Sequence, residues 1–103
     1  MKLIIKSRHM ELDDREKEYI EEQMKDIGLF VDKFTLVEVE ITDEGGPKRG
    51  RDKRAEITIN FADKTFRAEE VTSDVRGSVD LCKEKMEKQL RRHKERLLDK
   101  RKE

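Results

Sequence analysis

The chain has few of the residues that build covalent cross-links, base-stacking platforms or membrane spans. Its 103 residues include one cysteine, one proline, one tyrosine, four phenylalanines and no tryptophan. A single cysteine excludes an internal disulfide framework, and the scarcity of aromatic side chains disfavours a platform on which nucleobases stack. No apolar run has the length of a signal peptide or a transmembrane helix. We therefore expect a cytoplasmic domain that has no membrane partner.

Charged residues, by contrast, are abundant and unevenly distributed. They make up 49% of the chain, and 25 basic residues balance 25 acidic ones. The net charge is −9 over residues 9–44, +4 over 45–54 and +5 over 83–103. A chain of this length forms one domain with a small core, so we expect residues 1–103 to be a single domain whose basic segments can share a surface. Residues 98–103 have nothing to pack against and are expected to fray.

Hydrophobic periodicity predicts the element order β-α-β-β-β-α. Apolar residues alternate with polar ones, as in strands with one wet face, over residues 2–7, 34–42, 55–61 and 65–71. A helical period occupies residues 11–28 and then runs from about residue 74 nearly to the end. Because each element has one apolar side, we expect an α+β fold: a four-stranded sheet with both helices on one face, as in double-stranded-RNA-binding domains.

Boundary residues support this division. Asp13 is placed to cap the first helix, and Glu16 completes a capping box. Gly28 follows the last apolar position and is predicted to adopt the left-handed conformation that ends many helices. Residues 43–53 contain Gly and Pro and predict a long turn, and a tight turn is predicted at 62–64.

The last predicted helix carries basic side chains along one flank. Its apolar stripe, which we expect to face the sheet, consists of Val75, Val79, Cys82, Met86, Leu90 and Leu97, with His93 at its centre. Beside the stripe lies what we call the basic row: Lys85, Lys88, Arg92 and Arg96. Two interpretations stay open. The basic row is either a solvated face with ion pairs such as Glu84 to Lys88, or a surface that meets an anion despite repulsion between its members.

The sequence contains no group of residues with the spacing of a catalytic or metal-binding site. Cys82 on the apolar stripe is predicted to be a small core residue. His93 is predicted to pack at the edge of the sheet, with an RNA contact as the alternative. One cysteine and two histidines lack the spacing of a metal site or a nucleophile with its base. We therefore expect no enzyme, no cofactor, no metal and no small-molecule substrate.

The segment SDVRGSVDLCKEKMEKQLRRHKER resembles the last helix of the bacterial ribosome hibernation promoting factor and ribosome-associated inhibitor family, also known as sigma-54 modulation proteins. Asp74 and Asp80 match the first part of the family pattern, and residues 85–92 match the second. MKLIIKSRHMEL and FRAEE are similar to its first and fourth strands. Arg76 stands where the family usually has Tyr. The resemblance implies a short-type factor or the N-terminal domain of a longer one.

The resemblance also implies a function. Such a protein binds the small ribosomal subunit and its rRNA in the channel for messenger RNA and transfer RNA, competes with both, blocks translation and protects idle ribosomes under stress or in stationary phase. Lysine and arginine side chains would contact the backbone phosphates of the RNA and would recognise its base sequence only weakly. Candidate rRNA-binding residues are Arg8, Lys85, Lys88, Arg91, Arg92, Lys94 and Arg96. Further candidates, mostly from a basic turn that could serve solubility alone, are Lys48, Arg49, Arg51, Lys53, Arg54 and Arg76.

Two alternatives belong to other classes of binding protein. One is a protein-binding modulator of an alternative sigma factor, as an older family name suggests. The other is a general binder of double-stranded RNA, because that fold also places two helices on a sheet. The last helix of this chain begins with Asp74 and Asp80 rather than with the lysines usual in that fold, which disfavours the second alternative.

Overall fold

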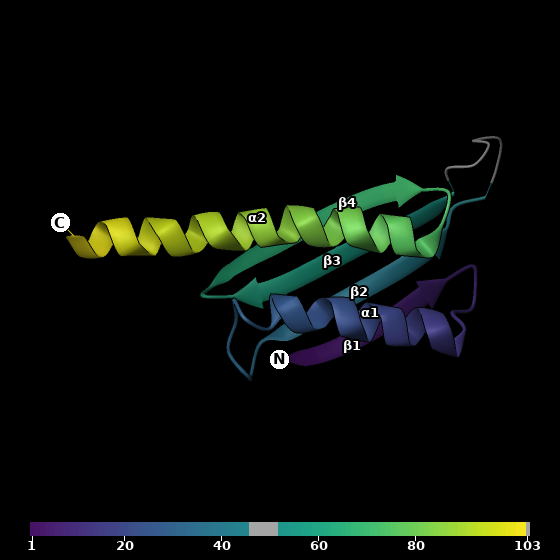
Figure 1. Ribbon diagram of the computed structural model, residues 1–103, viewed down its shortest axis with the longest axis horizontal. Coiled ribbons are helices and arrows are strands. Elements are labelled where there is room, and N and C mark those ends of the chain that lie inside the picture. The colour runs from purple at the N-terminus through teal and green to yellow at the C-terminus, as the bar shows by residue number, and fades with distance from the viewer. Residues whose placement is uncertain (46–51, 103) are drawn as a thin grey trace.

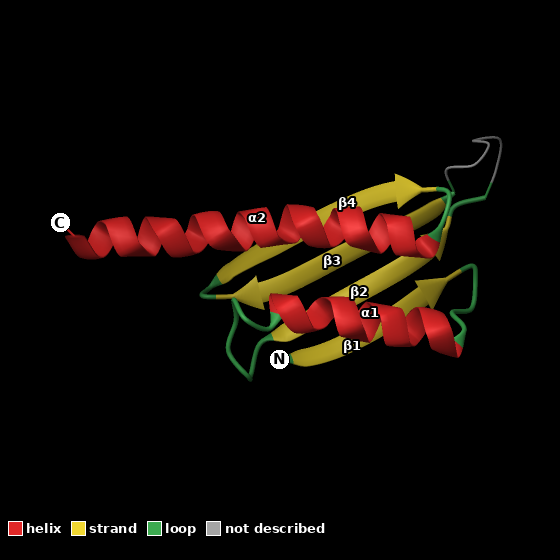
Figure 2. Ribbon diagram, viewed as in Figure 1, coloured by secondary structure: helices red, strands yellow, loops and turns green. Residues whose placement is uncertain are grey.

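The fold is a four-stranded sheet with two helices packed on the same face (Figures 1 and 2). The computed structural model describes residues 1–45 and 52–102. In chain order the elements are β1 (Lys2–Arg8), α1 (Asp14–Ile27), β2 (Leu36–Asp43), β3 (Lys53–Phe61), β4 (Lys64–Thr72) and α2 (Val75–Lys102). The predicted β-α-β-β-β-α order and the α+β class are confirmed.

The strands lie in the sheet in sequence order. β1 runs parallel to β2, with α1 as the crossover, and the other neighbouring pairs are antiparallel. Val39 lies opposite Ile57, which in turn lies opposite Ala68. Val39 and Ile57 are fully buried. The predicted strand registers are therefore confirmed, since a slip of one residue would have turned these side chains to solvent.

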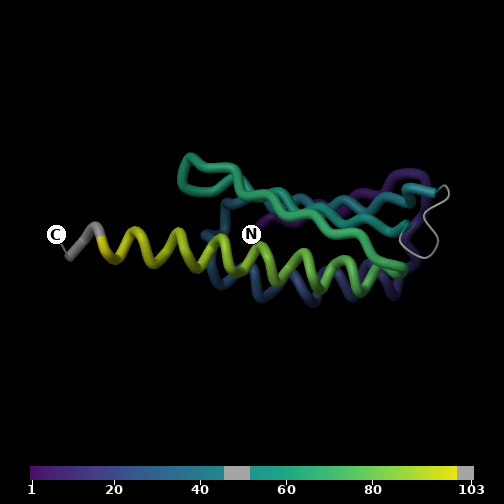
Figure 3. Tube along the Cα trace, turned by 90° about the horizontal axis from the view of Figure 1, so that it is seen from above, coloured from purple at the N-terminus to yellow at the C-terminus, as the bar shows by residue number. Residues whose placement is uncertain are grey.

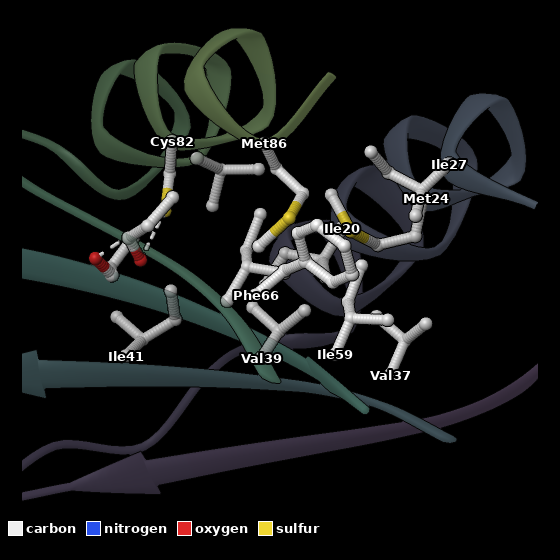
Figure 4. Packing of buried hydrophobic residues seen from close by; sticks show 14 of the residues in the cluster. Ile20, Met24, Ile27, Val37, Val39, Ile41, Ile59, Phe66, Cys82 and Met86 are labelled. Atoms are coloured by element: carbon white, nitrogen blue, oxygen red, sulfur yellow. Dashed lines mark hydrogen bonds between the residues drawn. The ribbon is translucent and has the colours of Figure 1, made fainter. Parts of the chain in front are cut away.

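The core fills the space between this sheet face and the two helices (Figure 4). Met24 from α1 and Met86 from α2 converge over Val39 and Phe66 in the sheet. Both methionines and Val39 are fully buried, and Phe66 is nearly so. Each helix thus buries its apolar stripe against the same face of the sheet, α2 over β3 and β4 and α1 beside it (Figure 1), which fixes the orientation of the opposite, charged helix faces.

Cys82 lies in this core, as predicted. Its side chain is fully buried, and its Sγ donates a hydrogen bond to the Ala68 carbonyl oxygen at 3.1 Å (Figure 4). Burial raises the pKa of the Cys82 thiol to about 12. The thiol is therefore protonated at neutral pH and serves as a packing residue.

The sequence predicted the start of α1 correctly but not the conformation at its end. The capping box is confirmed: the Glu16 amide donates to Asp13 Oδ1 at 2.7 Å, and the Asp13 amide donates to Glu16 Oε1 at 3.1 Å. The left-handed conformation predicted for Gly28 is wrong, because its φ and ψ are −59° and −20°. The chain instead keeps turning, since the amides of Leu29 and Phe30 donate to carbonyl groups three residues back.

A two-residue turn joins β3 to β4. Ala62 and Asp63 both have positive φ, 53° and 60°, as a type I′ hairpin requires. This confirms the predicted tight turn. It also places Lys64, the first residue of β4, beside the second half of α2.

α2 packs on the sheet only through its first part. Its apolar stripe is buried from Val75 to Leu90. Among the described side chains of α2 the last buried one is His93, whose ring meets Phe61 and Phe66 edge-on at centroid distances of 6.0 and 5.4 Å. His93 is 8% exposed and so packs on the sheet, as the first interpretation predicted. We call residues 75–90 the packed segment and residues 91–102 the outer segment.

The outer segment continues past the end of the sheet (Figure 3). Leu97 is 46% exposed, so the prediction that it faces the sheet is wrong. The reason is that the β3–β4 turn ends the sheet before the helix reaches this position. Helix is assigned through Lys102, and fraying of residues 98–103 stays a prediction. Despite the 28 residues of α2, no helix in the described ranges combines the length and the apolar character needed to cross a membrane.

The two edges of the sheet differ. At the β4 edge, α2 covers the strand: Gln89 Nε2 donates to the Arg67 carbonyl oxygen at 2.8 Å, and Lys85 Nζ to that of Glu69 at 3.4 Å. At the opposite edge, β1 pairs with β2 alone among the described strands. Side chains of α2 therefore occupy backbone acceptors that an added strand would need.

Candidate nucleic-acid interface

The first two members of the basic row are engaged within the molecule. Lys85 Nζ lies 2.6 Å from Glu70 Oε1, across the gap from α2 to β4, and this hydrogen bond raises the pKa of Lys85. Lys88 Nζ lies 3.8 Å from Glu84 Oε1, the ion pair that the solvated-face interpretation predicted. The positive charge of each of these two lysines is therefore partly neutralised by a neighbouring carboxylate.

The last two members of the basic row have a different environment. Among the described side chains, no carboxylate oxygen lies within 4.0 Å of Arg92 or Arg96, and the same holds for Lys94. Arg91 lies between the two situations, with one guanidinium nitrogen 4.0 Å from Glu87 Oε2. The basic row is thus divided: its positive charge is exposed without compensation only in the outer segment.

Arg92 and Arg96 line a cleft together with a base from the sheet. The cleft lies between α2 and the start of β4, and Lys64, Arg92, His93 and Arg96 contribute to its walls. Lys64 was not among the residues proposed from the sequence. It lies in residues 55–82, a stretch whose net charge is negative, so the net charge of the segment did not point to a basic residue there. Its position one residue after the tight turn is the signal that could have identified it.

Arg8 does not join this group. It ends β1, which points away from the outer segment, toward the opposite end of the sheet (Figure 1). One of its guanidinium nitrogens lies 4.0 Å from Glu40 Oε1, and the side chain is mostly exposed. Any RNA contact of Arg8 would therefore be a separate one.

The basic turn is divided by the structure. Lys48, Arg49 and Arg51 lie outside the described residues. Lys53 and Arg54 were assigned to the turn, but they begin β3, so that assignment is corrected. The antiparallel pairing with β2 and β4 extends to these two positions and brings carboxylates to them.

Both strand residues carry close ion pairs. Lys53 Nζ lies 3.3 Å from Asp43 Oδ2, and Arg54 places a guanidinium nitrogen 2.6 Å from Glu69 Oε2. The hydrogen bond to Glu69 raises the pKa of Arg54. Arg54 neutralises acids on the face of the sheet opposite the helices, whereas Lys53 and Asp43 lie at the end of the face that carries the helices.

Arg76 joins the two helices. Its guanidinium carbon lies 4.8 Å from the centre of the Tyr19 ring, in cation–π geometry. The Tyr19 hydroxyl donates to Asp80 on α2, and this hydrogen bond raises the pKa of Tyr19. Arg76 thus has a contact of its own within the domain.

Comparison with known families decides what kind of domain this is. A family model described as "Sigma 54 modulation protein / S30EA ribosomal protein" matches residues 3–98. The chain belongs to this family. The match extends from β1 into the outer segment of α2, so it includes every element of the fold. The resemblance drawn from the sequence is confirmed.

Two relatives in the S30EA family are ribosome hibernation promotion factors. The one from Deinococcus radiodurans is 28% identical over 99 residues, which cover 96% of this chain and 52% of that protein. The one from Lactococcus lactis subsp. cremoris is 30% identical over 99 residues, which cover 94% of this chain and 51% of that protein. The chain therefore spans about half the length of these relatives.

Solved structures share the fold. The Protein Y N-terminal domain of Thermus thermophilus aligns with a TM-score of 0.74 at 20% identity, over 90% of this chain and 99% of that one. A ribosomal subunit interface protein from Coxiella burnetii aligns with a TM-score of 0.73 at 16% identity, over 91% and 98%. This S30EA chain thus has the fold of those two domains.

Proposed function

We propose that this chain is a ribosome hibernation factor. It binds the small ribosomal subunit in the channel for messenger RNA and transfer RNA, blocks translation and protects idle ribosomes under stress or in stationary phase. The observation that carries the proposal is the S30EA family match over residues 3–98, together with relatives named ribosome hibernation promotion factor. The mechanism is steric exclusion in the cytoplasm, and it needs no catalytic step, cofactor or small-molecule substrate.

The outer segment of α2 is the part best suited to meet rRNA. Arg92, Lys94 and Arg96 are exposed residues of this segment. The segment extends past the sheet, where a polyanion can approach from more than one side (Figure 3). None has an internal carboxylate within 4.0 Å among the described residues, so a phosphate displaces counterions rather than a protein partner. Contacts of this kind read backbone shape and charge rather than base sequence.

The other candidates are ranked by their present partners. Four candidates are exposed and form ion pairs at the surface: Arg8, Lys85, Lys88 and Arg91. Surface ion pairs are weak, so these side chains can contact phosphates instead, with a modest gain in binding free energy. Lys53, Arg54 and Arg76 are held by acids or by an aromatic ring and would contribute least. Lys48, Arg49 and Arg51 remain candidates on their charge.

The test is sedimentation of the purified chain with purified small subunits through a sucrose gradient. We expect the chain to move with the subunits at low salt and to dissociate as salt rises, and we expect lower occupancy when initiator transfer RNA is bound beforehand. Added chain should also lower translation of a natural message in a cell-free system. Simultaneous full occupancy of the channel by transfer RNA and this chain would contradict the steric mechanism.

A second candidate function follows from the first words of the family description, which name sigma-54 modulation. A protein-binding role of this kind would use the acidic side of the helix pair, where Asp80, Glu84 and Glu87 line a groove with Tyr19. Capture of a sigma factor by the purified chain, without sedimentation with small subunits, would favour it. Displacement from subunits by any duplex RNA would instead identify a general double-stranded-RNA binder.

A further inference from the structure

We infer that the cleft between the β3–β4 turn and α2 binds a single phosphate group, which Lys64 holds together with Arg92 and Arg96. The inference rests on the proposed function for the source of the phosphate, the backbone of rRNA. It deepens that function, because it turns a set of charges on one helix into a two-sided site. It also adds a hairpin residue, Lys64, to the binding surface.

Three cations from two elements meet at this cleft. Arg92 and Arg96 are one helical turn apart on the same flank of α2, about 6 Å along the axis. Lys64 faces them from the first position of β4, where the type I′ turn sets the course of the strand. Guanidinium groups present paired N–H donors that match phosphate oxygens, and an ammonium group adds a compact charge. The arrangement fits one phosphate between the two walls.

The cleft lacks an internal anion that would neutralise it. Within 4.0 Å of any of the three cations, no carboxylate oxygen is found among the described side chains. Two acids lie in the surroundings: Asp99 lines the adjoining hollow with Lys64 and Arg96, and Asp63 lines a further hollow with Lys64. Three like charges in a concave site repel each other, and an anion between them relieves that repulsion.

A buried polar atom beside the cleft points to a missing partner. His93 is 8% exposed and lines both the cleft and the adjoining hollow. Its Nε2 is enclosed and has no hydrogen-bond partner in the described part of the chain. Buried polar groups in folded proteins nearly always have a partner, so an unpaired one needs an explanation, and a bound ion or group is one such explanation. Because His93 lines the cleft, its ring lies beside a group bound there.

The walls of the site are partly apolar. Phe66 lines the cleft, and Leu97, 46% exposed, lines the adjoining hollow. A nucleoside attached to the bound phosphate would cover this apolar surface. The site is therefore better matched to a phosphate within a nucleotide chain than to a small inorganic counterion alone.

The first experiment is a titration with small subunits at several salt concentrations, comparing the wild-type chain, Lys64→Ala and Lys17→Ala. Lys17 is a matched control: it is exposed on α1, far from the cleft in sequence and on another element. We expect Lys64→Ala to lower affinity roughly tenfold and to reduce the salt slope by about one unit, because one phosphate contact is lost. Lys17→Ala should leave both unchanged. Circular dichroism would check that all three chains are folded.

The outcomes separate the two proposals. If the wild-type chain binds small subunits and Lys64→Ala binds with the same affinity and salt slope, the phosphate site is overturned while the proposed function stands. If the wild-type chain does not bind small subunits, the proposed function fails, and the cleft is judged by the second experiment alone.

The second experiment is a titration with pyrophosphate followed by NMR. We expect saturable shifts of the His93 ring signals and of the backbone amides at Lys64 and Arg96, all abolished by Lys64→Ala. Such shifts would show that a free phosphate compound enters the site. Shifts spread evenly over all lysines and arginines would overturn the inference. Failure of pyrophosphate to move these signals, together with a Lys64-dependent salt slope on small subunits, would assign the cleft to phosphates of an RNA chain.

Discussion

In the packed segment of α2, Lys83 and Lys85 end on carboxylates of neighbouring elements, each at 2.6 Å. In the outer segment, Arg92 and Arg96 reach no carboxylate among the described side chains. All four side chains are basic and the helix is continuous. The difference arises because the packed segment lies between α1 and β4, which supply acids, whereas the outer segment extends past α1 (Figure 1) and faces the start of β4, where Lys64 adds a base.

This contrast shows that a row of bases read from a helix wheel is not one surface. A base that already contacts a carboxylate gains little from a phosphate, since one favourable contact is exchanged for another. A base without such a partner exchanges only mobile counterions. The binding potential of α2 is therefore concentrated where its packing ends.

The largest expected difference between the two segments is in thiol reactivity. At about pH 8, Cys82 in the packed segment should react with iodoacetamide far more slowly than an ordinary thiol. Its pKa of about 12, against 9.0, lowers the thiolate fraction on the order of 10³-fold. A cysteine introduced by Leu98→Cys, at a half-exposed position of the outer segment, should react at an ordinary rate. Equal rates for both thiols, followed by mass spectrometry, would show that the packed segment opens as readily as the outer one.

Stability should depend on the packed segment next. Met86→Ala removes a fully buried side chain and is expected to lower the free energy of unfolding by about 2–5 kcal/mol. Leu97→Ala removes a side chain that is already 46% exposed and should cost under about 1 kcal/mol. Urea denaturation followed by circular dichroism measures both. Similar losses would mean that the outer segment packs on something in solution.

Affinity for small subunits should show the opposite dependence. The double change Arg92→Ala and Arg96→Ala is expected to weaken binding roughly tenfold to a hundredfold near 0.1 M salt and to lower the salt slope by about two units. Lys85→Ala with Lys88→Ala removes the same formal charge from the same flank and should have a clearly smaller effect, because both lysines already have carboxylate partners. Equal losses in the two double variants would restore the view of the basic row as one surface.

The smallest effect concerns the start of the packed segment. Arg76→Ala removes the cation–π contact with Tyr19 and is expected to lower stability by about 0.5–1 kcal/mol, with little change in small-subunit affinity. Arg15→Ala on α1, an exposed change of the same charge, is the control for stability and should shift it less. A marked loss of affinity with unchanged melting temperature would instead make Arg76 an RNA contact.

Local patterns were sufficient to predict the elements and their registers. The alternation through Val37, Val39 and Ile41 identifies the buried face of β2 without knowledge of its neighbours, and all three residues are fully buried. The capping box at Asp13 and Glu16 is equally local and was equally correct. Boundaries were predicted less well: β3 begins at Lys53, inside the predicted turn, and Gly28 is not left-handed, because several helix endings suit a glycine and the sequence alone does not choose among them.

The candidate site depended on contacts that no local pattern contains. Glu70 partners Lys85, and Glu69 partners Arg54, across separate elements of the fold. The length of α2 relative to the sheet decides that Leu97 is exposed, and sequence periodicity continues through it without a break. Lys64 reaches the cleft only because the hairpin turns back toward α2. Positions on one flank were predictable, but the charge environment of each was not.

The capping of β4 by Lys85 and Gln89 has a consequence for behaviour at high concentration. A sheet with two open edges can add a neighbour on each side and grow into a filament, whereas a sheet with one open edge can join a single neighbour and then has no edge left to offer. Here α2 side chains occupy the outward carbonyl groups of Arg67 and Glu69, while the outer side of β1 has no strand neighbour among the described residues. We therefore expect any edge-to-edge association of this domain to use β1 and to stop at a pair, because the side chains of Lys85 and Gln89 obstruct β4.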